Sequence, residues 1–308
     1  MLINSPESHV ISNLGWIDRG NLWVCDTESS QVTTIPLSDA DYLTLHPGDG
    51  DIFAVVHNFA NERLEISAHD ISAPQKDLSR ISFIAGLAEF AGDPLVWLKL
   101  PRAYVIGANY LLLLDARKQT AELREFAWFK ESYDHDVQGI IAVTEVPGQA
   151  LVIVSIQRDS EPVLYCPDED QVIRKIPLAG RSGSPVFRFR KGGTEAWVND
   201  YDMLLRLNPE DWSIQDQVRL QWEPPGIDRF IGDFAFNKDE SLCAVARPFS
   251  GDVIALDTSS FNVTHRVRLG KHPFDVVLLA NGRIIARDWQ SGALLKGSLK
   301  PRRRWWLI

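Results

Sequence analysis

Short apolar runs separated by turn-forming residues recur along the chain, and two of these runs align without a gap. Val253–Phe261 matches Leu204–Trp212 position by position, and each run continues into a segment that alternates between apolar and polar residues. An apolar run, a tight turn and an alternating segment predict two antiparallel strands. Asp257 and Asn208 stand at the turn of the two copies, where their side chains can accept hydrogen bonds from the amides that follow.

A second hairpin precedes most copies of this unit. Its turn is usually marked by glycine or asparagine, and the strands predicted after it are Leu22–Cys25, Ile52–Val56, Leu151–Ser155, Ala196–Asn199, Leu242–Ala246 and Ile284–Ala286. Two hairpins make a four-stranded antiparallel blade, and a repeat of roughly 40 to 50 residues is the period of a β-propeller. We therefore expect an all-β fold: a β-propeller of about seven four-stranded antiparallel blades that forms a single domain over residues 1–308.

The segment Pro273–Ala286 has the pattern of a strand, a turn and a second strand, and Phe234–Asp257 repeats it. Both resemble the repeat of the YVTN-type (WD40-like) bacterial seven-bladed propellers, and this resemblance covers most of the chain at the level of blade pattern. It implies a propeller architecture. WD40 repeats in the strict sense match less well, because no blade has their Gly-His start and Trp-Asp end. Propellers serve as binding platforms and as enzymes, so the function has to be argued from the site.

Charge and composition disfavour several classes of function. The formal charge of −9 opposes attraction to nucleic-acid phosphate or an anionic membrane, so no general nucleic-acid binding is expected. No apolar stretch is long enough for a membrane span, and the first residues lack the pattern of a signal peptide. Cys25, Cys166 and Cys243 are far apart, which indicates buried thiols in a reducing compartment. Unless a signal segment was removed, these features predict a cytoplasmic protein.

The tryptophans divide by their positions. Trp23 and Trp197 share a register within strands, and Trp212 aligns with Phe261 after a turn, so we expect all three to be packing residues. Near the end of the chain three arginines precede two tryptophans, in 302–306. Two interpretations of this tail stay open: contact with phosphate or a lipid headgroup, or a final edge strand whose arginines face solvent.

The register of the repeat places several polar residues at the mouth of the central channel. Asn13, Asp233 and Asp275 occupy equivalent positions in consecutive blades, and Asn199 ends a second strand on the same face. Such oxygen ligands suit Ca²⁺ or another divalent cation. With a catalytic cation the protein would be a metal-dependent lactone or ester hydrolase that resembles the gluconolactonase propellers. That family has a glutamate ligand near the start of the first blade, where this chain offers only Asn13.

The same carboxylates have a structural alternative. Aspartates at this rim can cap loops, accept hydrogen bonds from backbone amides, or pair with Arg247 and Arg287. The chain contains no Gly-x-Ser-x-Gly elbow, phosphate-binding loop, dinucleotide fingerprint or Cys-x-x-Cys pair. We therefore expect no catalytic residue and no cofactor, with a divalent cation retained only in the hydrolase hypothesis.

Aromatic and basic residues in loops beside this face favour a binding surface. Tryptophan and arginine in loops are typical of protein-binding hot spots. His135 lies in the densest polar run of the chain and is predicted on the same face. The sequence therefore predicts a non-catalytic scaffold that binds a protein or peptide partner across the channel-mouth face, with these contact residues: Trp222, Arg229, Arg247, Arg287, Trp289 and His135.

Overall fold

The computed structural model describes the N-terminal part of the chain as backbone strands between Asn13 and Glu125. Strand backbone is also described for residues 140 and 141. Side chains are described for Glu122 and Trp128 and for residues 142–156, 161–178, 185–221, 229–279, 281–291 and 293–299. The chain divides into two compact units, Met1–Asp216 and Gln217–Ile308.

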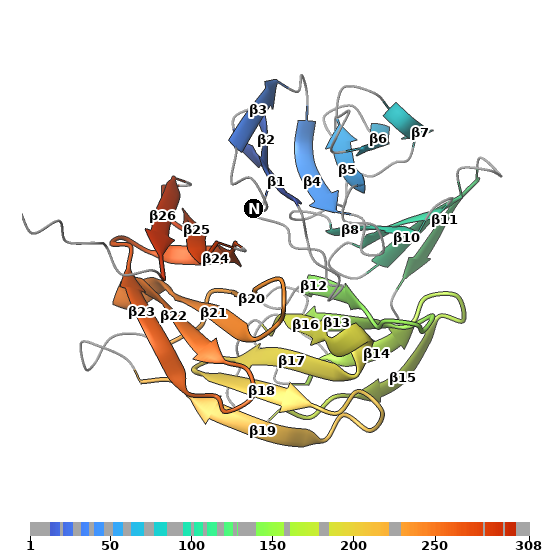
Figure 1. Ribbon diagram of the computed structural model, residues 1–308. Coiled ribbons are helices and arrows are strands. Elements are labelled where there is room, and N and C mark those ends of the chain that lie inside the picture. The colour runs from blue at the N-terminus through green and yellow to red at the C-terminus, as the bar shows by residue number, and fades with distance from the viewer. Residues whose placement is uncertain are drawn as a thin grey trace, which may run out of the picture. The chain divides into compact units, whose positions relative to one another are not determined.

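In the part of the chain that the structure describes, the strands form seven antiparallel sheets that follow one another in chain order (Figure 1). The first sheet contains β1 (Asn13–Asp18), β2 (Asn21–Asp26) and β3 (Val32–Pro36). The second contains β4 (Ala40–Leu45), β5 (Ile52–His57), β6 (Arg63–Asp70) and β7 (Asp77–Ile84). The third contains β8 (Leu95–Lys99), β9 (Arg102–Ile106), β10 (Tyr110–Asp115) and β11 (Thr120–Glu125).

The remaining sheets have the same up-and-down order. The fourth contains β12 (Ile140–Glu145), β13 (Val152–Ile156), β14 (Val163–Cys166) and β15 (Gln171–Lys175). The fifth contains β16 (Phe187–Arg190), β17 (Glu195–Asp200), β18 (Met203–Leu207) and β19 (Ile214–Arg219). In the second unit the sixth sheet contains β20 (Phe234–Phe236), β21 (Leu242–Arg247), β22 (Asp252–Asp257) and β23 (Val263–Arg268). The last sheet contains β24 (Pro273–Leu278), β25 (Arg283–Asp288) and β26 (Leu294–Ser298).

Several consecutive sheets meet along their first strands. In the first unit β1 contacts β4, β4 contacts β8 and β8 contacts β12, and in the second unit β20 contacts β24. Contacts between the first strands of neighbouring sheets are typical of propeller blades, in which the first strand is the innermost. The four-stranded antiparallel order predicted from the repeat is thus confirmed for the second to sixth sheets, while the first and last have three strands in the described residues.

The turn chemistry predicted from the aligned repeat is confirmed. Asn208 Oδ1 accepts a hydrogen bond from the Glu210 amide at 3.1 Å, and Asp257 Oδ1 accepts one from the Ser260 amide at 2.8 Å. Each turn ends in an aromatic residue with a left-handed backbone, Trp212 at φ 63° and Phe261 at φ 57°. The amide of each aromatic residue donates back to the carbonyl of the turn residue. The short side chain of Asn or Asp therefore closes the same turn in both sheets.

Burial follows strand position within each sheet. The second strands β13, β17 and β21 are buried along nearly their whole length, whereas the fourth strands β15, β19 and β23 are mostly exposed. A strand is buried on both sides when its sheet is covered on both faces, and an edge strand borders solvent. Cys166 and Cys243 are buried free thiols at strand positions, as predicted.

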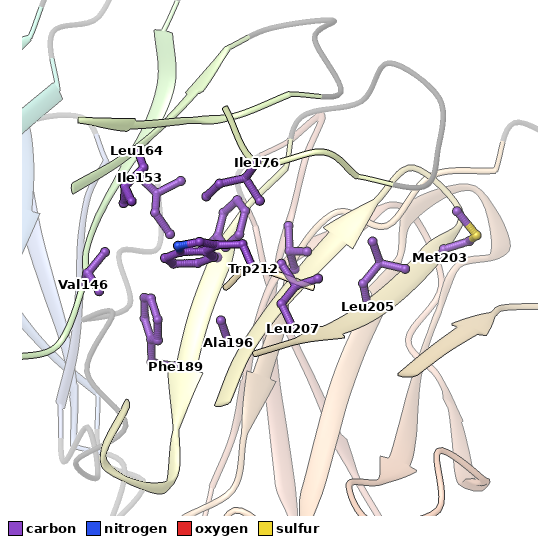
Figure 2. Packing of buried hydrophobic residues seen from close by; sticks show 12 residues of the cluster. Val146, Ile153, Leu164, Ile176, Phe189, Ala196, Met203, Leu205, Leu207 and Trp212 are labelled. Carbon is purple, nitrogen blue, oxygen red and sulfur yellow. The ribbon is translucent and has the colours of Figure 1, made fainter. Parts of the chain in front are cut away.

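The core between the fourth and fifth sheets is built around Trp212. Figure 2 shows its indole in the middle of the cluster, with Leu164 and Ile176 on one side and Phe189 and Ala196 on the other. The Phe189 and Trp212 rings meet edge to face, with centroids 6.4 Å apart. The indole is buried, which confirms the packing role expected of this tryptophan. Trp197 is buried as well.

The core between the last two sheets contains four alanines among its eight buried residues. Ala235, Ala244, Ala246 and Ala286 pack there with larger aliphatic residues. Small residues let two sheets approach closely, so the first strands of these sheets and the loops at their ends are brought together. Of the helices among the described residues, none has the length and apolar character needed to cross a membrane.

Candidate functional site

Four aromatic rings gather at one end of the last two sheets. We call Phe230, Phe249, Phe274 and Trp289 the aromatic cluster. Phe230 contacts all three of the others, with ring centroids 5.2 Å from Phe249, 6.0 Å from Phe274 and 5.9 Å from Trp289. The three phenylalanines are partly exposed and Trp289 is 46% exposed. The cluster is therefore open to solvent rather than part of the core.

Each ring of the cluster comes from a different segment of the second unit. Phe230 leads into β20, and Phe249 lies in the short 3₁₀ helix η2 (Pro248–Ser250) between β21 and β22. Phe274 is the second residue of β24, and Trp289 directly follows β25. The sixth and last sheets, drawn in orange and red in Figure 1, thus contribute two rings each, and the surface depends on their packing.

Asp288 holds the turn that carries Trp289. Its Oδ1 accepts hydrogen bonds from the Ser291 amide at 2.8 Å and the Ser291 hydroxyl at 2.6 Å, and its Oδ2 accepts one from the His272 amide at 2.8 Å. The Trp289 amide in turn donates to the His272 carbonyl at 2.9 Å. Burial alone raises the pKa of Asp288, but these hydrogen bonds outweigh it and lower the pKa to about 2. The carboxylate is therefore charged at neutral pH and fixes the position of the indole.

Gly232 sets how closely the two sheets approach beneath the cluster. A Cβ at this position would lie 2.9 Å from both the Cα and the carbonyl oxygen of Phe274. Backbone atoms of a packed strand have little room to move away, so any larger residue would push the sheets apart. The absence of a side chain at Gly232 is what allows Phe230 and Phe274 to meet.

A pair of buried carboxylates lies near the aromatic cluster. The Arg287 guanidinium binds Asp275 Oδ2, from Nε at 2.6 Å and from Nη2 at 2.5 Å. Burial raises the pKa of Asp275; Arg287 acts in the opposite direction, and the charge of Asp233 raises the pKa further. The charge of Asp233 thus acts on Asp275, its counterpart in the predicted register, and Asp275 pairs with Arg287, as the structural alternative proposed.

Arg247 belongs to a second buried ion pair. Its Nε and Nη2 each donate to a different oxygen of Asp252, both at 2.7 Å, and Nη1 donates to the Gln221 carbonyl. Arg266 binds the same carboxylate. The sequence predicted Arg247 as an exposed contact residue, whereas it is 4% exposed, because the hairpin places it directly opposite Asp252. It supports the turn of Phe249 from inside the sheet.

Among the described residues, the exposed charges around the aromatic cluster are positive. Arg229, Arg268 and Lys271, which we call the basic margin, are exposed and lie in the segments that carry or adjoin the cluster. Residues 229–233, 247–252, 266–275 and 287–291 together contain six basic residues, four aspartates and no glutamate. All four aspartates are buried. Solvent at this end of the second unit therefore meets cations and aromatic rings.

Several predicted site residues fall elsewhere. Trp222 and His135 lie outside the described residues, as does the side chain of Asn13, whose backbone lies in β1. Asn199 is buried in the first unit, where its Oδ1 accepts a hydrogen bond from the Val186 amide at 2.6 Å. Within the part of the chain that the structure describes, no group of three or more His, Cys, Asp or Glu residues is arranged to hold a metal ion.

Three residues of the aromatic cluster were missed by the sequence argument, namely Phe230, Phe249 and Phe274. One signal was present: Phe249 and Trp289 both lie in the turn between the second and third strands of their sheets, and Tyr201 occupies that turn in the fifth sheet. Aromatic residues repeated at one turn position point to a shared face. Phe230 and Phe274 carry no such signal.

Comparison with known proteins shows the fold and no more. No protein-family model matches the chain, and no curated protein matches its sequence. The chain is similar in structure to the β-propeller domain of Cps50 (Swd1) from Myceliophteria thermophila, with a TM-score of 0.66 at 12% identity over 97% of this chain and 99% of that one. It is also similar to hydrazine synthase from Kuenenia stuttgartiensis, with a TM-score of 0.66 at 11% identity over 96% and 94%. The fold is therefore that of a β-propeller.

Proposed function

We propose that the chain is a non-catalytic propeller scaffold that binds a protein or peptide partner through the aromatic cluster. The carrying observation is the exposure of Trp289, which is 46% exposed although it contacts three phenylalanine rings. Tryptophan is the residue type most often found at the energetic centre of protein interfaces. Rings held in place by their neighbours lose little conformational entropy on binding, which favours affinity.

The surroundings of the cluster support binding more than chemistry. Asp275 Oδ2 is bound by both Nε and Nη2 of Arg287, so its charge is already balanced within the fold. Asp288 is engaged by the turn that positions the indole. Both carboxylates therefore stabilise the fold, and this role accounts for their burial. A metal-dependent lactone or ester hydrolase with Asp233 and Asp275 among its ligands stays the alternative, but Asp275 is already bound by Arg287.

The remaining sequence predictions belong to this proposal as well. We propose one propeller of about seven blades over residues 1–308, similar to the YVTN-type family, in a cytoplasmic protein. Arg229 and Arg287 lie in the segments that carry the cluster, whereas the other predicted contact residues, Trp222 and His135, lie outside the described residues. The fold by itself does not choose between a scaffold and an enzyme, because one of the two similar structures is a domain of Cps50 (Swd1) and the other is hydrazine synthase.

The proposal is tested by peptide display on the full-length chain. Peptides are selected against the wild type, and their affinities are then measured for the wild type, Trp289→Ala and the matched control Val263→Ala. Val263 is the other strongly exposed apolar side chain of the second unit among the described residues, at 56%, and lies in the outer strand β23. We expect Trp289→Ala to weaken binding by about tenfold or more and Val263→Ala to leave it unchanged. Peptides that bind Trp289→Ala as well as the wild type would contradict the proposal.

A further inference from the structure

The charges that border the aromatic cluster define the kind of partner it accepts. Arg229 directly precedes Phe230, and Lys271 directly precedes His272, whose ring centroid lies 6.2 Å from that of Phe249. Arg268 is paired in register with Asp252 at the same end of the sixth sheet. The basic margin thus lies on the segments that carry or contact the rings. This inference rests on the proposed function and specifies the ligand of that same surface.

The aspartates of this end do not cancel the basic margin at the surface. Asp252 is bound by Arg247 and Arg266, Asp275 is bound by Arg287, and Asp288 is bound by backbone and hydroxyl donors. A buried carboxylate that is paired with an arginine contributes little net charge at the surface. Asp288 has no such partner and is charged, but it is only 1% exposed. The opposite ends of the same sheets carry exposed charges of both signs, among them Lys238, Asp239 and Arg283. Among the described residues, the exposed charges at this end of the second unit are therefore positive, in a chain whose formal charge is −9.

We infer that the occupant of the aromatic cluster is a peptide segment in which acidic side chains flank an aromatic or aliphatic anchor. The anchor packs against the exposed part of Trp289, and the acidic side chains meet Arg229 and Lys271. Opposite charges at the rim of an interface raise the association rate and select among partners. The Trp289 ring, which the bound anchor covers, supplies most of the affinity. The two features therefore have separate roles.

A polyanion such as a nucleic acid shares the acidic charge but fits the ring geometry less well. Phe230 stands at 72° to Phe249 and at 89° to Trp289, so ring edges cover neighbouring ring faces. Stacking of successive bases needs open ring faces along a groove. The formal charge of −9 also repels a long polyanion. A short segment with a few carboxylates interacts mainly with the nearby cations, because salt screens the more distant charges.

The test is a pair of parallel peptide selections on the full-length chain, one with the wild type and one with the double variant Arg229→Glu/Lys271→Glu. We expect the wild-type pool to be enriched in Asp and Glu beside an aromatic or aliphatic residue, and the enrichment to disappear or change sign in the double variant. The affinity of a selected acidic peptide should fall by about tenfold in the double variant. The matched control, Lys238→Glu/Arg283→Glu, reverses two exposed cations at the opposite ends of the sheets and should leave the affinity unchanged.

The outcomes separate this inference from the proposed function. Peptides that depend on Trp289 but are neutral or basic, or that bind the double variant equally well, would overturn the acidic occupant and leave the binding surface standing. Peptides that bind independently of Trp289 would overturn the proposed function itself. A labelled single-stranded oligonucleotide that binds more tightly than the acidic peptides, and is released by Arg229→Glu/Lys271→Glu, would replace the peptide with a nucleic acid.

Discussion

The ring of Phe230 stands edge-on to the indole of Trp289, with the centroids 5.9 Å apart and the planes at 89°. Phe230 leads into the sixth sheet and Trp289 follows the second strand of the last one. The contact therefore exists only while these two sheets are packed together. A surface of this kind is sensitive to changes in the packing beneath it, and several of the following predictions use that sensitivity.

Gly232→Ala should destabilise the fold through a backbone clash. The new Cβ would lie 2.9 Å from the Phe274 Cα and carbonyl oxygen, so the expected loss is about 1–3 kcal/mol in the free energy of unfolding, measured by urea denaturation. Gly148→Ala is the control, because its Cβ would meet nothing within 4 Å and only its φ of 73° opposes the change. Equal losses of unfolding free energy in the two variants would show that the two sheets can move apart at Gly232 at little cost.

Asp288→Asn should change how stability depends on pH. Because the pKa of Asp288 is lowered from 3.8 to about 2 in the fold, its contribution is complete above about pH 4 and is lost as the pH falls toward 2. The variant should be less stable than the wild type at neutral pH, and the difference should shrink between about pH 4 and 2. Denaturation curves recorded across that range measure it. A difference that stays constant with pH would mean that the charge of Asp288 plays no part.

Asp252→Asn should be much more destabilising than Asp216→Asn. Asp252 is buried and holds Arg247 and Arg266, so removing its charge leaves two guanidiniums uncompensated at a cost of about 3 kcal/mol. Asp216 pairs with Arg206 at 2.9 Å, but its side chain is half exposed, and such pairs contribute about 1 kcal/mol or less. Equilibrium denaturation of both variants checks the contrast. Similar losses would indicate that solvent reaches the Asp252 pair.

Trp212→Ala and Trp289→Ala should separate a packing tryptophan from a binding one. Trp212 is 4% exposed and fills the core between two sheets, so its removal should cost about 3–5 kcal/mol. Trp289 is 46% exposed, and its removal should cost only about 1–2 kcal/mol. Unfolding followed by far-ultraviolet circular dichroism gives both values. If Trp289→Ala proved as costly as Trp212→Ala, the indole would be a core residue and not a contact for a partner.

The fold was predictable because its signals are local. The side chains of Asn208 and Asp257 bond amides only two or three residues ahead, so the turn can be recognised from the sequence of one repeat. Strand order within a sheet then follows from the lengths of the hairpins. The number of blades is a property of ring closure and does not follow from any one repeat.

The candidate site was predictable only where register alone decides position. Register predicted that Asp233 and Asp275 are neighbours, and the charge of Asp233 does act on Asp275. Arg287 was a candidate partner for these aspartates, and it pairs with Asp275. The sequence offered pairing of Arg247 with an aspartate only as an alternative and did not identify Asp252, which stands directly opposite Arg247 across the hairpin. Phe230 and Phe274 were missed for a related reason, since a phenylalanine is core or surface according to how two sheets pack.

Hydrogen–deuterium exchange of the full-length chain, with and without a peptide selected against it, tests the binding surface most directly. Four segments that are separate in sequence carry the aromatic cluster and its supports: 229–233, 248–252, 271–275 and 287–291. We predict that the peptide slows exchange of backbone amides in these four segments together, and that Trp289→Ala abolishes the effect. Protection confined to other parts of the chain, with these four segments unchanged, would contradict the account.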